Sequence, residues 1–178
     1  MRIIAGSRKG ARIAAPRGQT TRPTGDRVRE AAFNLIGPLE DADVLDVYAG
    51  SGAMGLEALS RGARSAVFVE SDRAACRTIE RNLEKLELLG ARIVCEEAIR
   101  ALAGEAAAGR RYDLVLVDPP YGLFPSVQTA LTTYLPALVA AGGLVLVETG
   151  ASDQPELPLP LRTSRRYGVA RLSVFTSP

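Results

Sequence analysis

The sequence contains no histidine and only two cysteines among its 178 residues. The absence of histidine excludes imidazole acid–base catalysis, serine–histidine and cysteine–histidine dyads, and most zinc sites. Cys76 and Cys95 lack a metal-binding spacing and need not pair, so we interpret both as ordinary buried thiols. We therefore expect no metal site.

Long apolar runs are also absent. No stretch approaches the roughly 20 residues that span a bilayer, and the N-terminus lacks the apolar core of a signal peptide. We expect a cytoplasmic protein without a membrane partner. Hydrophobic residues make up 47% of the chain, which suffices for one domain with a sizeable core.

The formal net charge of +2 conceals an uneven distribution. Residues 1–29 carry eight basic side chains and a single acidic one, Asp26, whereas the rest of the chain is acidic on balance. Such asymmetry is typical of a basic arm that binds a polyanion, although a solvated charged segment is the alternative. Most of these side chains are arginines, which pair with phosphate oxygens two at a time.

The motif Asp118-Pro119-Pro120-Tyr121 follows an apolar run, 112–117, that is typical of a buried parallel strand. Its position predicts the carboxyl end of that strand, the edge where open α/β sheets bind ligands. The Asp118 carboxylate and the Pro119 carbonyl can each accept one N–H of an exocyclic amine, and Tyr121 can stack on a flat ring. Because Asp and Pro favour turns, a plain turn is the alternative interpretation.

A second motif begins with a strand-like run, 44–49, that passes into Gly50-Ser51-Gly52-Ala53-Met54-Gly55 and then into a helical pattern. In this context a G-x-G-x-x-G loop indicates a nucleotide-type cofactor. A further apolar run, 66–69, ends at Glu70, where a carboxylate can accept both hydroxyls of a ribose. A tight turn without a ligand is the alternative for the glycine loop alone.

A glycine loop and a following acid fit NAD and S-adenosylmethionine equally well. Asp46 lies inside the first strand, four residues before Gly50, where a methyltransferase places an acid that faces the methionine part of its cofactor. Hydride transfer has no evident use for Asp-Pro-Pro-Tyr. These two details favour methyl transfer over an oxidoreductase.

Strands and helices alternate from Asp43 onward, as in a mostly parallel sheet covered on both faces. Asp26 or Thr24 can cap a first helix, and a later helix is expected to break at Pro136. The expected hairpins are 1–6 with 10–14, as two edge strands, and 162–166 with 171–175. The other expected strands are 91–95 and 143–148, and the expected helices are 26–36, 72–89 and 125–141.

Several blocks, in this order, resemble one family. They are Met1-Arg2-Ile3-Ile4-Ala5-Gly6, Arg22-Pro23-Thr24, Asp26-Arg27-Val28-Arg29-Glu30-Ala31, Asp46-Val47-Tyr48-Ala49-Gly50-Ser51-Gly52, Gly55-Leu56-Glu57-Ala58-Leu59-Ser60-Arg61-Gly62-Ala63, Asp-Pro-Pro-Tyr and Tyr167-Gly168. Together they resemble the RsmD-type 16S ribosomal RNA guanine-N2 methyltransferases of bacteria. The N-terminal block is the specific part, because many amino-methyltransferases share the other two motifs.

The resemblance implies a Rossmann-like class I methyltransferase fold, with a seven-stranded, mostly parallel sheet (residues 26–178) and a basic N-terminal β-hairpin that binds RNA (residues 1–25). It implies S-adenosylmethionine as cofactor and, as target, guanine 966 in the 16S RNA of the assembling small ribosomal subunit. We expect a monomer. Where the family commonly shows Gly-Asp-Ala, this chain has Glu96-Glu97-Ala98; Glu97 can still accept from the adenine amino group.

The site residues expected on these grounds form three sets. The catalytic residues are Asp118, Pro119, Pro120 and Tyr121. The cofactor-binding residues are Asp46, Tyr48, Ala49, Gly50, Ser51, Gly52, Gly55, Glu70, Ser71, Glu97 and Ala98. The substrate-binding residues are Arg8, Lys9, Arg12, Arg22, Thr24, Arg27 and Tyr121.

Three alternatives stay open at this point. The same chemistry can act on DNA adenine or protein glutamine, because the amine-binding motif does not define the rest of the acceptor. The chain can instead be a catalytically silent RNA-binding assembly factor. An NAD-linked oxidoreductase is the remaining alternative, and the lack of a plausible proton donor near the predicted site argues against it.

Overall fold

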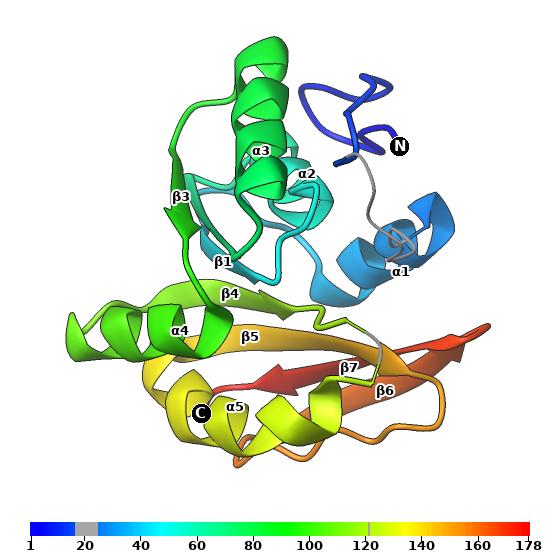
Figure 1. Cartoon of the computed structure of the whole chain (residues 1–178). Helices are drawn as coiled ribbons and strands as arrows, with labels where there is room; N and C mark the ends of the chain where they lie inside the picture. Colours follow the sequence, from blue (N-terminus) through cyan, green and yellow to red (C-terminus); the bar gives the residue numbers. More distant parts are fainter. Residues whose placement is uncertain (17–24, 121) are drawn as a thin grey trace.

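One sheet of seven strands organises the computed structural model, which describes residues 1–16, 25–120 and 122–178. The strand order is β3-β2-β1-β4-β5-β7-β6 (Figure 1). Neighbouring strands pair in parallel from β3 through β2, β1 and β4 to β5. Strand β7 pairs antiparallel with both β5 and β6. The predicted seven-stranded, mostly parallel α/β fold is therefore confirmed.

The bounds of the elements agree closely with the sequence pattern. The strands are β1 (Asp43–Val47), β2 (Ser65–Glu70), β3 (Ala91–Cys95), β4 (Tyr112–Val117), β5 (Val139–Gly150), β6 (Leu161–Tyr167) and β7 (Ala170–Thr176). The helices are α1 (Asp26–Ile36), α2 (Ala53–Ser60), α3 (Arg73–Leu86), α4 (Ala98–Ala107) and α5 (Phe124–Leu138).

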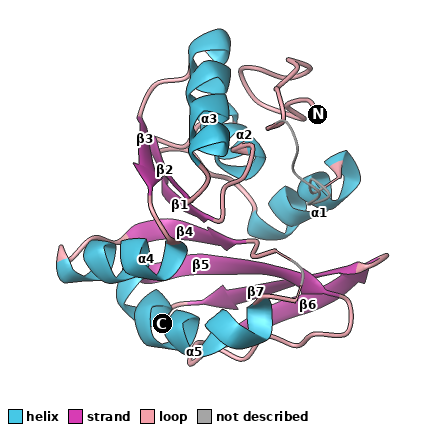
Figure 2. Cartoon of the chain, viewed as in Figure 1, coloured by secondary structure: helices cyan, strands magenta, loops and turns pink. Residues whose placement is uncertain are grey.

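Two hydrophobic layers enclose the sheet. Helices α1, α2 and α3 cover one face together with the N-terminal segment, and α4 and α5 cover the other (Figure 2). Alternate side chains of a strand point to opposite faces; Val44 thus joins the α1–α3 layer and Leu45 the α4–α5 layer. Burial on both faces explains why the central strands are almost continuously apolar.

Two local expectations about helices are wrong. Gly25, not Asp26, occupies the N-cap of α1, and no side chain caps it; Thr24 lies outside the described residues. Asp26 instead lies in the first turn, where it pairs with Arg29 at 2.9 Å. Pro136 does not break α5, which continues to Leu138.

The N-terminal segment folds back on itself, but outside the main sheet. A single antiparallel bridge joins Arg2 and Arg12, and the Ile3 amide donates to the Ala11 carbonyl at 2.9 Å. Two extended edge strands were expected here, and the structure has this bridge in their place. The buried side chains of Ile3 and Ile13 hold the segment against the α1–α3 layer.

The two cysteines form a disulfide, which contradicts the interpretation as ordinary buried thiols. Cys76 lies in the first turns of α3 and is buried, whereas Cys95 ends β3 and is exposed. The parallel pairing of β2 with β3 places Cys95 opposite Glu70, only six residues before Cys76. Their Cα atoms are consequently 6.1 Å apart, within the range that a disulfide spans.

Candidate active site

A cavity of about 500 Å³ lies at the carboxyl ends of the central parallel strands. This is the edge at which open α/β sheets bind ligands. Most of the residues predicted from the two motifs line it. They are Asp46, Tyr48, Ala49, Gly50, Ser51, Glu70, Ser71, Glu97, Ala98, Asp118, Pro119 and Pro120. Tyr121 lies outside the described residues.

Two predicted cofactor residues, Gly52 and Gly55, are not among the residues that line the cavity. A Cβ at Gly55 would approach the Phe68 ring to 2.3 Å, so glycine is needed here for close packing of α2 on the sheet. Gly52 has a φ of 78° at the N-cap of α2, a conformation that glycine adopts without steric cost. Both glycines thus have a structural role, and other residues of the glycine loop line the cavity.

Asp46 is the most deeply buried acid of the cavity, with 2% of its surface exposed. Its Oδ2 accepts the Gly55 amide at 2.8 Å, near the N-terminus of α2, where the helix dipole favours negative charge. Burial raises the pKa of Asp46 to about 7, and the nearby carboxylates of Asp118 and Glu70 add to the rise, while the Gly55 amide opposes it. A cationic ligand group beside Asp46 would favour its ionised form.

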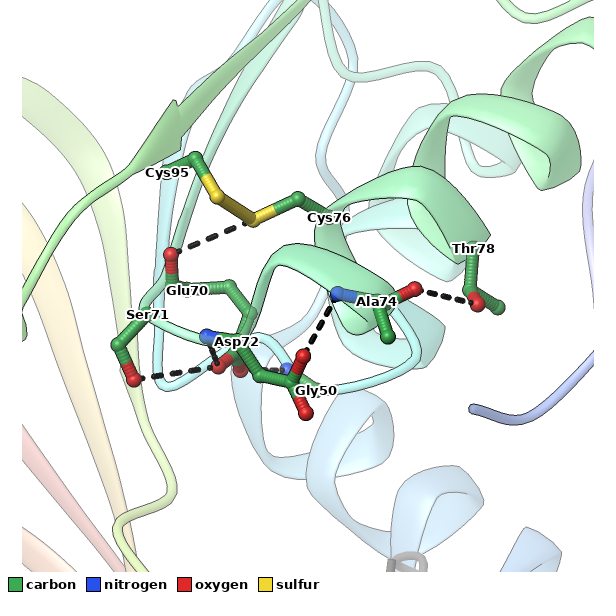
Figure 3. The surroundings of a disulfide bond; sticks show 8 residues. All are labelled: Gly50, Glu70, Ser71, Asp72, Ala74, Cys76, Thr78 and Cys95. Carbon is green, nitrogen blue, oxygen red and sulfur yellow. Dashed lines mark hydrogen bonds between the residues drawn. A yellow bond between two sulfur atoms is a disulfide. The ribbon is translucent and has the colours of Figure 1, made fainter. Parts of the chain in front are cut away.

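Glu70 joins the glycine loop to the turn that follows β2 (Figure 3). One oxygen accepts the Gly50 amide at 2.8 Å, and the other accepts the Asp72 amide at 2.8 Å. The Cys76 sulfur lies 3.4 Å from the Glu70 carbonyl oxygen. The disulfide thus joins the first turn of α3 to the end of β3 beside the Glu70 backbone carbonyl. The Glu70 Oε2 accepts one protein donor and retains a lone pair for a ligand.

Glu97 caps α4, because its two oxygens accept the amides of Ile99 and Arg100, each at 3.0 Å. Glu97 therefore has a structural role, to which the predicted contact with an adenine ring would add. Tyr48 has a left-handed backbone with a φ of 65°, and its buried hydroxyl has no hydrogen-bond partner among the described residues. Burial and the Glu97 carboxylate raise the pKa of Tyr48 to about 12. Tyr48 lines the cavity, but its hydroxyl oxygen is itself buried.

Asp118, Pro119 and Pro120 line the same cavity as the glycine loop. The Asp118 amide donates to the Val47 carbonyl at 3.4 Å, so the end of β4 stays beside the end of β1. In the parallel pairing of β1 with β4, Asp46 lies opposite Leu116 and Val47 opposite Val117, the residue before Asp118. A turn follows, in which the Leu123 amide donates to the Pro120 carbonyl at 2.9 Å.

Several cavity residues were missed from the sequence. Glu148, in β5, is an acid that no motif indicated. The N-terminal segment also contributes, and only the tertiary structure brings it here. The additional lining residues are Met1, Ala15, Pro16, Ala53, Met54, Val69, Asp72, Glu96, Leu123 and Glu148.

Two buried polar side chains seat the N-terminal segment beside the cavity. Asn82 of α3 exchanges hydrogen bonds with the amide and carbonyl of Ala14, at 2.8 and 3.0 Å, and donates to the Ser51 carbonyl at 3.2 Å. Glu57 of α2 accepts the amides of Ile4 and Ala5, at 2.7 and 2.9 Å. The segment is thereby linked to the glycine loop itself.

Among the described residues, those predicted to bind substrate are not part of the cavity lining. Lys9 and Arg12 are exposed, as is Arg27 on α1. Arg8 is half-buried, and its Nε donates to the Leu86 carbonyl at the end of α3, so it also anchors the segment. Arg22 and Thr24 lie outside the described residues.

Two classes of site find no support in the described ranges. Across residues 1–16, 25–120 and 122–178, no group of three or more histidine, cysteine or acidic side chains is arranged to hold a metal ion. Within the same ranges, no helix is long and apolar enough to cross a membrane.

Comparison with known proteins identifies the family. The model of a family described as "Conserved hypothetical protein 95" matches residues 1–176. YlbH of Bacillus subtilis is 45% identical over 184 residues, which cover 98% of each chain. "Ribosomal RNA small subunit methyltransferase D" of Escherichia coli is 44% identical over 122 residues, 68% of this chain and 60% of the relative.

The solved structures agree. The Escherichia coli protein yhhF superposes with a TM-score of 0.84 at 35% identity, covering 99% of this chain and 97% of the other. Among more distant structures, a Salinibacter ruber RNA methyltransferase in complex with S-adenosyl-L-homocysteine has a TM-score of 0.68 at 17% identity, over 88% of this chain and 94% of the other; it shows the fold alone. The chain therefore belongs to the RsmD-type family of ribosomal RNA methyltransferases.

Proposed function

We propose that this protein transfers a methyl group from S-adenosylmethionine to the exocyclic N2 amine of a guanine in small-subunit ribosomal RNA during subunit assembly. One observation carries the proposal: a single cavity joins the glycine loop and Asp46, at the tip of β1, to Asp118 and Pro119, at the tip of β4. By the family resemblance, the target is the guanine at position 966. The enzyme would act as a monomer in the cytoplasm, where this RNA is assembled.

The residues on the β1–β3 side of the cavity fit the cofactor. Asp46 would bind the amino group of its methionine part, and Glu70 would bind the ribose hydroxyls. Glu97 and the adjoining Ala98 lie where an adenine would be bound. The cofactor supplies, when bound, a methyl group already activated on a sulfonium with a neutral leaving group.

The protein's contribution on the other side is alignment. The guanine N2 lone pair is delocalised into the ring and is a poor nucleophile. Hydrogen bonds from its two N–H groups to the Asp118 carboxylate and the Pro119 carbonyl would turn the lone pair toward the methyl group. The same acceptors favour the positive charge that develops on nitrogen. Asp118 need not be a strong base, because the methylated ammonium loses its proton readily to water.

A guanine reaches this cavity only when it is unstacked, so we propose that the target base is flipped or looped out. Tyr121 would replace the lost stacking, which is worth about 1–3 kcal/mol per base by alanine substitution. The exposed Lys9 and Arg12, together with Arg22 and Arg27, would bind the surrounding phosphates.

The test is methyl transfer from labelled S-adenosylmethionine to small subunits purified from cells that lack this gene. We expect one methyl group per particle, recovered after digestion as N2-methylguanosine. Label recovered from DNA as N6-methyladenine, or from protein as methylglutamine, would contradict guanine as the acceptor. It would still support transfer of a methyl group to an amine nitrogen. Cofactor binding by calorimetry without transfer to any fraction would identify a silent assembly factor.

A further inference from the structure

Glu148 is a buried acid on the acceptor side of the cavity, and neither motif accounts for it. Only 6% of the surface of Glu148 is exposed, yet Glu148 lines the same cavity as Asp118 and Pro119. Burying a carboxylate costs free energy unless it accepts hydrogen bonds. A Glu at this position therefore calls for donors, whether from the protein, from a ligand or from both.

The sheet register places Glu148 beside Asp118. Val117 of β4 pairs with Val147 of β5 in parallel. The next residues are Asp118, which follows β4 directly, and Glu148, which lies inside β5 two residues before its end. Leu116 and Leu146, two residues earlier, both belong to the α1–α3 layer. Because side chains alternate along a strand, Glu148 points to that same face, from a strand that lies about 4.8 Å from β4. Asp118 lines the same cavity.

Guanine presents two neighbouring donors on its Watson–Crick edge, the N2 amine and the N1–H. Adenine presents an unprotonated N1 beside its amine, and cytosine an unprotonated N3, so either would set a lone pair against a carboxylate. Two adjacent carboxylates match the donor–donor pattern of guanine. Single-stranded RNA bases are commonly recognised through hydrogen bonds on this edge.

We propose that Glu148 accepts the guanine N1–H while Asp118 and Pro119 hold N2, and that Glu148 thereby selects guanine over adenine. This inference rests on the proposed function and adds the means of base selection. An ionised carboxylate has about four lone-pair sites, so Glu148 can accept N1–H while it also accepts a donor from the protein.

The test replaces the target guanine by 2-aminopurine, which keeps the N2 amine but carries no proton on N1. The RNA is otherwise the same, and kcat/KM for methyl transfer is measured with both substrates. We expect the wild-type enzyme to prefer guanine by at least about tenfold, because a site built around a donor rejects the analogue that lacks it. Equal rates with the two bases would overturn the proposal without any variant.

The variant Glu148→Gln sharpens the test, because its amide can donate to the unprotonated N1 of 2-aminopurine. We expect the preference for guanine to shrink by at least about tenfold, with S-adenosylmethionine affinity within a few-fold of wild type by calorimetry. Glu156→Gln, the same change at an exposed position outside the cavity, should leave the preference unchanged. A purely structural Glu148 would lower both rates equally and preserve the ratio, which would refute base selection by this residue.

The outcome separates this inference from the proposed function. If the wild-type enzyme methylates neither guanine nor 2-aminopurine in small subunits or RNA, the proposed function fails. If it methylates guanine N2 and the guanine preference is the same in wild type and Glu148→Gln, only the role of Glu148 fails.

Discussion

The two sides of the cavity are built differently. On the β1–β3 side, the carboxylates of Asp46, Glu70 and Glu97 each accept backbone amides within or next to their own βα unit. The opposite side draws on Asp118 and Pro119, which follow β4, and on Glu148, which lies in β5 about 30 residues later in the chain. The first side is fixed by local structure before a ligand arrives, whereas the second depends on contacts between segments far apart in the sequence.

This difference predicts that variants on the two sides can be separated by their readouts. A change on the glycine-loop side should alter cofactor affinity or the stability of the fold. A change on the acceptor side should alter transfer while cofactor affinity stays the same.

The largest expected effect is that of Asp118→Ala on transfer. Removing one group that stabilises the charge of the transition state typically lowers kcat by about 10²- to 10³-fold. We expect at least this loss of kcat. The affinity for the cofactor, measured by calorimetry, should stay within a few-fold of wild type. Asp118→Asn retains one acceptor oxygen and should keep partial activity. Normal turnover of Asp118→Ala would remove this residue from the mechanism.

Reduction of the Cys76–Cys95 disulfide should weaken the cofactor side. Removing a disulfide typically costs about 2–4 kcal/mol of unfolding free energy, and this one lies beside the Glu70 carbonyl. Urea unfolding with and without dithiothreitol measures the loss, and calorimetry should show weaker cofactor binding after reduction. A Cys76→Ser, Cys95→Ser double variant should show no response to the reductant.

Gly55→Ala should destabilise the protein by about 1–3 kcal/mol, because the new Cβ meets the Phe68 ring and overpacks the core. Gly104→Ala is the matched control. It lies in α4 with no atom within 4 Å of the added Cβ, so it should stabilise the helix by up to about 1 kcal/mol. Thermal unfolding that ranks both variants alike would contradict the packing role of Gly55.

Asp46 should give the ligand-free protein a distinct pH dependence. Its pKa is raised to about 7 in the fold from 3.8, so the folded state binds the proton more tightly than the unfolded state. Its contribution to stability is therefore present at low pH and is lost as pH rises toward 7, by at most about 1.4 kcal/mol per pH unit. Asp46→Asn should flatten this part of the curve of unfolding free energy against pH. A curve with the same slope in both proteins would contradict the buried, proton-binding Asp46.

The smallest effect concerns the exposed basic residues. Replacing Lys9 and Arg12 by Gln should weaken RNA binding and make the slope of log K against log salt shallower by about 1.4, if each contacts one phosphate of a single strand. Cofactor affinity should not change. Arg165→Gln with Arg166→Gln removes the same charge from edge strand β6. An equal loss of RNA affinity in both double variants would show general attraction to the polyanion and not a contact through the N-terminal segment.

On the glycine-loop side, most of the residues predicted from the sequence line the cavity, because the signals there are local. A glycine loop, Asp46 and Glu70 each follow or lie in a strand whose apolar pattern is unambiguous, and parallel pairing brings their strand ends to one edge. Asp118 and Pro119 could be placed for the same reason. The register that sets Glu148 beside Asp118 depends on the pairing of β4 with β5, which no short motif encodes.

The remaining errors also have a long-range origin. Cys76 and Cys95 become neighbours only through the β2–α3–β3 crossover, so their spacing alone did not indicate a disulfide. Arg8 stays a predicted substrate contact, but no motif indicated its bond to the Leu86 carbonyl. The role of Asn82 depends on the docked Ala14, and no sequence pattern marks that contact.

The most direct test of the two-sided cavity is a crystal structure with S-adenosyl-L-homocysteine. The account predicts its amino group at Asp46, its ribose at Glu70, and its sulfur directed at the gap beside the Asp118 carboxylate and the Pro119 carbonyl. A sulfur that points away from Asp118, or a side chain that fills the space between the tips of β1 and β4, would contradict the proposed methyl transfer.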